Sequence, residues 1–264
     1  MALDFTLSKY RELCQSVLKS QYTVLTVAAY LTSEKLPEKC IILRHDIDRK
    51  PFNALRMAEV ENKNGIRSTY YFRINNTVFL PDLIKEIAAM GHEIGYHYEA
   101  LDKAKGDYQR AIRIFEQDLV KLRKVADVKT ICMHGNPLTK WDNRDLWKKY
   151  DFKNFGLVGE AYLSFHDIAY FSDTGRNWGG KHSVKDWMPP ASQGKNVKDI
   201  DAKSTDDIIE VVKKETFESI YLLAHPERWS NSLIAWITDW LVDIGVNMVK
   251  RMLGLLKRTA ILKK

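Results

Sequence analysis

Two aspartates and three histidines in this chain have the types and spacing that metal-assisted chemistry on water uses. Asp46 and Asp48 stand two residues apart, so in a strand both carboxylates face the same side. One carboxylate can hold a divalent cation while the other, kept ionised by that cation, accepts a proton from water. A neutral imidazole such as that of His97 is a good further ligand for zinc or a similar metal. His134 and His225 also follow short apolar segments, and they complete the set of candidates.

The segments that precede these side chains predict strands alternating with helices. This alternation indicates βα units around a parallel sheet or barrel, in which ligand sites form at the carboxyl ends of the strands. The candidate carboxylates and imidazoles fall at those ends. The expected strands are 40–43, 67–73, 92–97, 129–134, 168–172 and 219–225, and the expected helices are 7–18, 51–65, 81–91 and 108–125.

Three motifs resemble those of the polysaccharide deacetylases, the NodB-homology carbohydrate esterases. Residues 44–48 (RHDID) match the branch of the family that writes its first motif as HDxD. Residues 91–97 (GHEIGYH) follow an apolar helix as in the family, and residues 222–226 (LLAHP) resemble its last motif. The resemblance covers about residues 38–229. It implies an α/β fold, a distorted (β/α) barrel, and a metal-dependent N-deacetylase activity.

The resemblance also implies a role for each matched residue. Asp46 would be the catalytic base and Asp48 a metal ligand. His97 would be the first histidine ligand, and His225 would be the general acid that protonates the leaving amine. The expected cofactor is a divalent metal, with zinc as the expected ion.

One ligand position departs from the family pattern. The family places a second histidine four residues after the first, and this sequence has Leu101 there. We expect His134 to replace the missing ligand, although it could instead contact the substrate, and Glu99 is a further candidate ligand. The missing histidine also leaves open a different class of function, a catalytically degenerate protein that binds glycan at the membrane surface.

Five residues near the motifs are expected to contact the substrate. The aromatic rings of Tyr71 and Trp229 could stack on a sugar face or could instead belong to the core, and Asp173 could instead orient His225, as an aspartate does in the family. The set is Arg44, Tyr71, Asn136, Asp173 and Trp229.

Charge is concentrated at the end of the chain. Of the net charge of +7, residues 231–264 hold +4, from six Lys or Arg against two Asp. The remaining chain is almost balanced, which argues against a nucleic-acid partner. We therefore divide the chain into a barrel domain with an N-terminal helical extension, 1–230, and a C-terminal amphipathic basic helix, 231–264. The wide apolar arc of residues 246–264 favours contact with an anionic membrane surface over packing on the barrel or in a homodimer, whereas the earlier part of this helix could be the final helix of the barrel.

The rest of the sequence predicts the cellular setting. The N-terminus has no apolar segment typical of a secretory signal, no run of about 18 apolar residues exists, and three cysteines are scattered along the chain. We expect a cytoplasmic protein, peripheral at the inner face of the membrane. The expected reaction is hydrolysis of an acetamido group on an amino sugar, in a surface-glycan or lipid-linked glycan precursor such as those of lipopolysaccharide or O-antigen biosynthesis.

Overall fold

A computed structural model of the chain describes residues 3–179, 188, 202–230 and 232–245. One sheet of eight strands lies at its centre, and every strand pairing in it is parallel. The order is β6-β5-β4-β3-β2-β8-β7, with β1 paired to the first half of β2. The strands are β1 (Thr23–Leu25), β2 (Cys40–Ile47), β3 (Thr69–Phe72), β4 (Glu93–Tyr98), β5 (Val128–Met133), β6 (Gly159–Glu160), β7 (Ala169–Ser172) and β8 (Ser219–Ala224).

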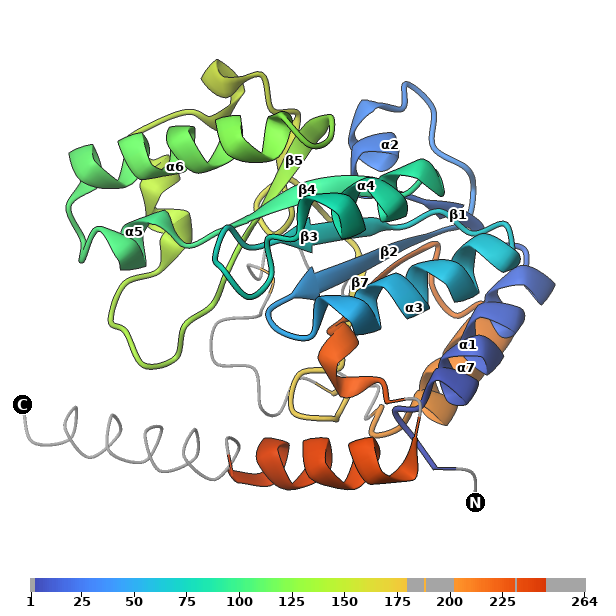
Figure 1. Cartoon of the computed structure of the whole chain (residues 1–264). Helices are drawn as coiled ribbons and strands as arrows, with labels where there is room; N and C mark the ends of the chain where they lie inside the picture. The colour runs from blue at the N-terminus through green and yellow to red at the C-terminus, as the bar shows by residue number, and fades with distance from the viewer. Residues whose placement is uncertain (1–2, 180–187, 189–201, 231, 246–264) are drawn as a thin grey trace, which may run out of the picture.

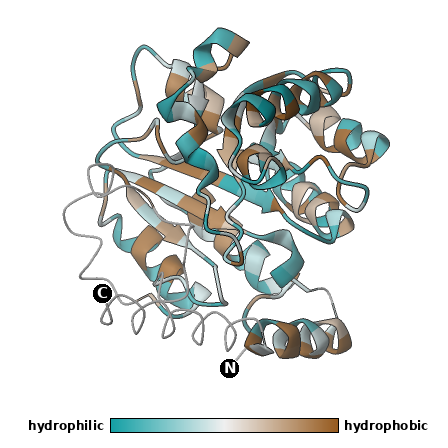
Figure 2. Ribbon diagram, turned by 90° about the vertical axis from the view of Figure 1, so that its left-hand side faces the viewer, coloured by the Kyte–Doolittle hydropathy of each residue, from teal (hydrophilic) through white to brown (hydrophobic). Residues whose placement is uncertain are grey.

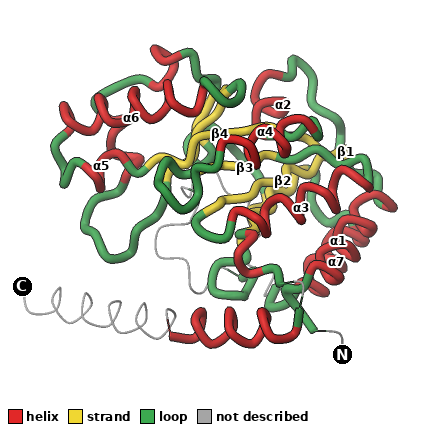
Figure 3. The backbone as a smooth tube through the Cα atoms, viewed as in Figure 1, coloured by secondary structure: helices red, strands yellow, loops and turns green. Residues whose placement is uncertain are grey.

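Helices connect successive strands and cover the outer side of the sheet (Figures 1 and 3). Prolines occupy the first turn of two of them, α3 (Pro51–Lys63) and α4 (Pro81–Ala89), where their fixed φ is compatible with the helix and their missing N–H costs no hydrogen bond. The helices are α1 (Leu7–Lys19), α2 (Val27–Thr32), α3 (Pro51–Lys63), α4 (Pro81–Ala89), α5 (Ala100–Lys103), α6 (Tyr108–Arg123) and α7 (Thr205–Lys214), with 3-10 turns η1 (Asn143–Lys148), η2 (Phe152–Phe155) and η5 (Pro226–Arg228).

The sheet curls strongly, so that strands far apart in the order face each other. In a flat sheet β2 and β5 would lie about 14 Å apart, because neighbouring strands are about 4.8 Å apart. Yet Arg44 Nη2 on β2 lies 2.7 Å from Cys132 Sγ on β5. Near the two edges, the rings of Tyr162 and Tyr170 have centroids 6.2 Å apart. The predicted distorted (β/α) barrel is therefore confirmed, in an open form in which the described edge strands β6 and β7 do not pair.

The main strands and helices lie where the sequence predicts them, and five strands and helices were not predicted, namely β1, β6, α2, α5 and α7. β1 and β6 have only three and two residues, too few for a periodic pattern, and they form because a neighbouring strand supplies their hydrogen bonds. α7 has a readable signal, since Ser204 and Asp207 form a reciprocal capping box at its N-terminus.

A last helix, residues 233–245, follows η5 and lies across the end of the body (Figure 1). The rest of the predicted basic tail, 246–264, lies outside the described residues. Within the described part of the chain, helices long and apolar enough to cross a membrane are absent. The division of the chain at residues 230 and 231 stays a prediction.

Candidate active site

The predicted site residues meet at the carboxyl ends of four strands. Asp46 is the second-last residue of β2, and Asp48 follows that strand directly. His97 lies near the end of β4, whereas His134 and His225 come directly after β5 and β8. All residues of β2 are buried, because both faces of this strand are covered. The polar end of the strand is therefore held inside the barrel. The sequence therefore correctly predicts that these five residues share one edge of the sheet.

Asp48 lies between two imidazoles. Its Oδ1 is 3.2 Å from His97 Nε2 and 3.4 Å from His134 Nε2. The Asp48 side chain is partly exposed, but this oxygen is buried and has no hydrogen-bond partner. Burial opposes its ionisation, yet the two histidines, with His134 contributing most, hold the pKa of Asp48 well below its usual range. The ionised oxygen and the two ring nitrogens come from separate strands and face one another, so together they could bind one cation.

The ring of His97 is fixed by a backbone contact. Its Nδ1 lies 3.1 Å from the carbonyl oxygen of Cys132, which can only accept, so Nδ1 carries the hydrogen. Nε2 therefore faces Asp46 and Asp48, with a lone pair when the ring is neutral and with a proton when the ring is charged. Burial opposes the charged ring, but Asp46 and Asp48 raise the pKa of His97, which means that this gap attracts positive charge.

His134 is suited to a neutral, ligating state. Burial lowers its pKa, so the imidazole carries no charge at neutral pH and Nε2 can offer a lone pair. Its Nδ1 lies 3.5 Å from Glu99 Oε2, on the side away from Asp48. Glu99 itself accepts a hydrogen bond of 2.6 Å from Arg73, so its charge is already paired with the guanidinium of this arginine. The geometry thus favours His134 over Glu99 as the third ligand.

Asp46 is held by an arginine of its own strand. Arg44 donates to both of its carboxylate oxygens, at 2.8 and 2.6 Å. Burial opposes ionisation, but Arg44 outweighs it and lowers the pKa of Asp46. Asp46 Oδ2 also lies 3.8 Å from His97 Nε2. Asp46 is therefore an ionised, oriented carboxylate beside the gap between Asp48 and the imidazoles, the position required of a proton acceptor.

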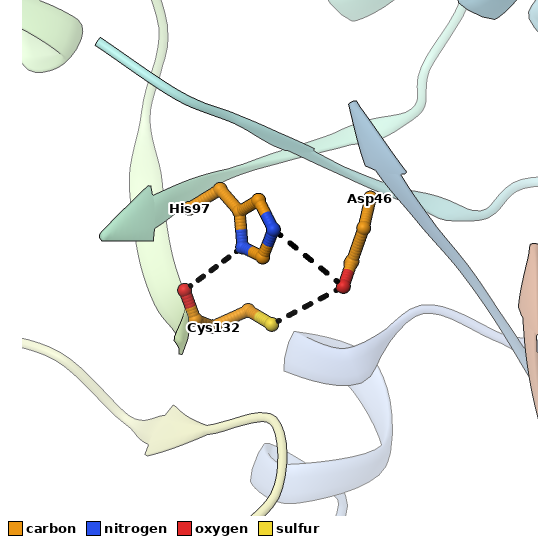
Figure 4. A group of neighbouring side chains, drawn as sticks. All are labelled: Asp46, His97 and Cys132. Carbon is orange, nitrogen blue, oxygen red and sulfur yellow. Dashed lines mark hydrogen bonds and ion pairs between the residues drawn. The ribbon is translucent and has the colours of Figure 1, made fainter. Parts of the chain in front are cut away.

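A second set of possible ligands overlaps the first. Asp46, His97 and Cys132 each offer an atom within 4.8 Å of the other two (Figure 4). However, the Arg44 guanidinium lies 2.6 Å from Asp46 Oδ2 and 2.7 Å from Cys132 Sγ, so its positive charge already occupies this side. A divalent cation would be repelled there, whereas the described groups within 4 Å of Asp48 Oδ1 that could carry a positive charge are the imidazoles of His97 and His134. The donor set that best fits a metal is Asp48, His97 and His134, one carboxylate and two imidazoles, which is typical of zinc.

His225 is held by a buried aspartate. Its Nδ1 lies 2.6 Å from Asp173 Oδ1, and its backbone N–H donates to Asp173 Oδ2 at 2.9 Å. Arg228 Nη1 and Trp229 Nε1 donate to the same carboxylate at 3.2 and 2.9 Å. Since the carboxylate only accepts, the imidazole must carry its hydrogen on Nδ1, which leaves Nε2 for the substrate. β8 pairs with β2 so that Ala224 lies opposite His45, and the next residues, His225 and Asp46, therefore lie at neighbouring strand ends.

Four of the five predicted substrate contacts have buried side chains in this structure, and their contact with substrate stays a prediction. Tyr71 and Trp229 are both 0% exposed, as is typical of core aromatic residues. Tyr71 is fixed by Thr130 at 2.8 Å, and Trp229 supports Asp173. Arg44 pairs with Asp46, and Asp173 orients His225, as the sequence reading offered as its alternative.

Asn136 is the remaining predicted contact. It is partly buried in the loop after β5, and its Oδ1 accepts from the backbone N–H of Leu138 at 3.0 Å. It can still reach a bound molecule with its amide nitrogen. This part of the prediction therefore stays open.

Glu227 is a site residue that the sequence does not predict. It lies in η5, two residues after His225, and is buried with Oε2 lacking a hydrogen-bond partner. Burial and the charge of Asp48 raise its pKa to about 7. Arg49 Nη2 approaches its other oxygen to 3.8 Å. Its position beside the last motif is the only signal that could have indicated it.

Comparisons with known proteins give distant likenesses. The sequence matches no family model and no curated protein. A Mycobacterium smegmatis protein assigned to the polysaccharide deacetylases has 12% identity and a TM-score of 0.48, over 86% of this chain and 93% of its own. The Xyl-CE4 domain of a multidomain xylanase from the hindgut metagenome of Trinervitermes trinervoides has 14% identity and a TM-score of 0.42, over 79% and 84%. A CE4 family pseudoenzyme from Bacillus anthracis has 12% identity and a TM-score of 0.36, over 71% and 69%.

These proteins bear names from the family that the sequence motifs resemble. At identities of 12–14% and TM-scores below 0.5, a likeness does not decide membership of a family or an activity. The functional conclusion for this chain therefore depends on the geometry of its own site.

Proposed function

We propose that this protein is a metal-dependent N-deacetylase that hydrolyses the acetamido group of an amino sugar. The observation that carries the proposal is the buried Asp48 Oδ1, which lies without a hydrogen bond between the Nε2 atoms of His97 and His134. An ionised carboxylate, Asp46, stands on one side of this gap. His225, held by Asp173, follows β8 where that strand pairs with the end of β2. We assign these residues as the ligand set, the base and the acid of the proposed reaction.

The expected cofactor is a divalent ion, zinc by its donor set, held by Asp48, His97 and His134. The chemistry that such an ion supplies is polarisation of the amide carbonyl and acidification of water. Asp46, kept ionised and oriented by Arg44, accepts the proton of the attacking water. His225 then delivers a proton from Nε2 to the departing amine, while Asp173 stabilises the charged imidazole. The products are acetate and the free amino sugar.

The proposed substrate is a precursor of a surface glycan, free or carried on a lipid, such as those of lipopolysaccharide or O-antigen assembly. The proposed setting is the cytoplasmic face of a membrane. Support for this setting comes from the sequence, in which positive charge and apolar residues are concentrated after residue 231. A nucleic-acid partner is not part of the proposal, because the net charge before residue 231 is small.

The test is acetate release from N-acetylhexosamine substrates by protein loaded with zinc, compared with the Asp46→Asn variant. We expect release by the parent and a loss of at least 100-fold in the variant, with equal metal content in both. If neither releases acetate while both bind the glycan, the chain is instead a degenerate binding protein. If neither binds metal or glycan, the proposal is wrong.

A further inference from the structure

The helix 233–245 is attached to the body by its polar side. Asp239 pairs with Lys50 and accepts from Ser230 Oγ at 2.9 Å. One turn further, Asp243 accepts from Arg176 Nε at 2.7 Å and is 7% exposed. Trp236 Nε1 donates to the backbone oxygen of Asp4 at 2.7 Å. The residues at 236, 239 and 243 therefore form the stripe that faces the protein.

The opposite side of this helix presents large apolar side chains to the surroundings. This orientation is the reverse of a helix that packs on a soluble core, where the apolar stripe faces inward. Figure 2 shows this helix, with several brown, hydrophobic residues, at the margin of the molecule and apart from the layers that cover the sheet. The exposed fractions are 62% for Leu233, 78% for Ile234, 42% for Ile237, 41% for Trp240, 57% for Leu241 and 37% for Ile244.

The spacing of these residues shows that they form one continuous face. Positions 234, 237, 241 and 244 are three or four residues apart, and 233 and 240 extend the same side. Exposed apolar groups scattered singly are ordinary, but a contiguous face of this kind marks a contact with an apolar partner. Trp240, partly exposed and stacked on Trp236 at a centroid distance of 6.0 Å, is of the residue type that prefers the boundary between water and lipid.

Charge favours lipid as the partner. Lys50 and Arg49 lie on the polar side of the helix, where they approach Asp239 and Asp243, so the charge that bears on the partner is that of the sequence that follows the helix. The sequence after the described helix, 246–264, contains six Lys or Arg and no Asp or Glu, among many apolar residues. An apolar face followed in the sequence by this excess of positive charge complements an anionic bilayer, which attracts basic residues close to its surface. A second copy of this chain would bring like charges together instead.

The helix is also joined directly to the candidate active site. Asp243 Oδ1 lies 4.0 Å from Arg49 Nη2, and Arg49 follows the proposed ligand Asp48 in the chain. The same guanidinium approaches Glu227 in η5, two residues after His225. The polar stripe of the helix thus rests on the segments that carry the carboxyl ends of β2 and β8.

From these relationships we propose that the outward face of helix 233–245 docks on an anionic bilayer and holds the active site against its surface. The substrate class that fits this placement is an N-acetylated amino sugar anchored to a membrane lipid. The assignment of the substrate rests on the proposed deacetylase function, whereas the docking itself does not.

Vesicle sedimentation with the full chain tests the docking. The probes are vesicles of phosphatidylglycerol and phosphatidylcholine, compared with phosphatidylcholine alone. The test variant is Ile234→Ser with Leu241→Ser, and the matched control is Leu18→Ser with Val120→Ser, two residues that are about half exposed on α1 and α6. We expect the parent and the control to bind the anionic vesicles and the test variant to bind at least tenfold more weakly.

Two results would overturn the docking proposal. One is equal binding, or no binding, by the parent and the test variant. The other is a parent that does not bind vesicles but is a dimer in light scattering, while the test variant is a monomer. This result would make a second copy of the chain the partner.

Activity measurements test the proposed lipid-linked substrate separately from the docking. The test variant should keep acetate release from a soluble N-acetylhexosamine and lose at least fivefold on the same sugar linked to a lipid in anionic vesicles. Absence of activity on both by the parent would contradict the deacetylase function and leave the docking result standing.

Discussion

His225 and Asp173 form a buried pair in which the aspartate fixes the hydrogen on one ring nitrogen. The Nδ1 to Oδ1 distance is 2.6 Å, and the second carboxylate oxygen accepts from the backbone N–H of His225. Burial and Arg228 oppose the charged imidazole, but Asp173 outweighs both and raises the pKa of His225. The ring is therefore held with Nε2 outward and is stabilised as an acid, the state that protonates a leaving amine.

We predict that Asp173→Asn impairs the acid step without removing the site. The amide leaves the ring without its ionised acceptor, so kcat should fall about 10²- to 10⁴-fold with little change in KM. His225 must be protonated to act, so activity is lost as the pH rises through its pKa. Because the variant lowers that pKa, the loss should begin at a lower pH. A pH profile of kcat measures both effects.

The control for this prediction is Trp229→Phe, which removes one donor to Asp173 but leaves the pair intact. It should cost less than tenfold in kcat and leave the alkaline limit in place. An Asp173→Asn profile that overlays the parent would show that Asp173 has only a structural role.

A second prediction separates the roles of the two aspartates after β2. Asp46→Asn keeps an oxygen for Arg44 and leaves Asp48 untouched, so metal content should stay at the parent level while kcat falls at least 100-fold. Asp48→Asn removes the charge that faces both imidazoles, so bound metal should fall at least tenfold. Metal analysis and acetate release on the same samples distinguish the two. Equal metal loss in both variants would place Asp46 among the ligands.

The strand ends that carry the site were predictable because a parallel strand has a strong local signal. The run before Asp46 is apolar and β-branched, and it changes abruptly to polar residues where the barrel opens. The topology then brings such ends together without further information. The convergence of Asp48, His97 and His134 follows from this rule, even though these residues are separated by up to 86 positions in the sequence.

The direction in which side chains face depends on the curl of the sheet and was not predictable in the same way. Arg44 and Tyr71 are of residue types that often bind sugars, yet the curl turns both into the filled interior, where Arg44 pairs with Asp46. Glu227 is the converse case. A single acidic residue after a proline carries no pattern, and only the packing of η5 against the end of β2 reveals its place near Asp48.

A third prediction concerns the metal itself. Removal of a divalent ion by a chelator should lower the melting temperature, because a ligand at about 100 times its Kd stabilises the folded state by about 2.7 kcal/mol. His134→Ala should weaken zinc binding at least tenfold, since it removes one of three ligands. His166→Ala, an exposed histidine in a loop, is the matched control and should bind zinc as the parent does. Unchanged zinc affinity in His134→Ala would remove it from the ligand set.

A fourth prediction concerns a buried carboxylate on the outer side of β2, away from the candidate active site. Glu61 is 0% exposed and accepts hydrogen bonds from Tyr10, His45 at 2.8 Å, Ser68 at 2.5 Å and Tyr70 at 2.6 Å. Burial opposes its ionisation, but His45 and the other donors lower the pKa of Glu61 from 4.5 to about 2. The ionised form is therefore favoured in the folded state.

The sign of the pH effect follows from this depressed pKa. The unfolded chain takes up the proton near pH 4.5, whereas the folded protein resists it until about pH 2. Glu61 thus contributes stability above pH 4.5, of about 3 kcal/mol at 1.36 kcal/mol per pKa unit, and this contribution is lost as the pH falls toward 2. In Glu61→Gln the free energy of unfolding should be lower than in the parent by about 3 kcal/mol at pH 7. Urea unfolding at pH 7, 5 and 3 should show this difference shrinking at the lowest pH. A difference that stays constant across this range would mean that Glu61 stabilises the fold by packing and not by its charge.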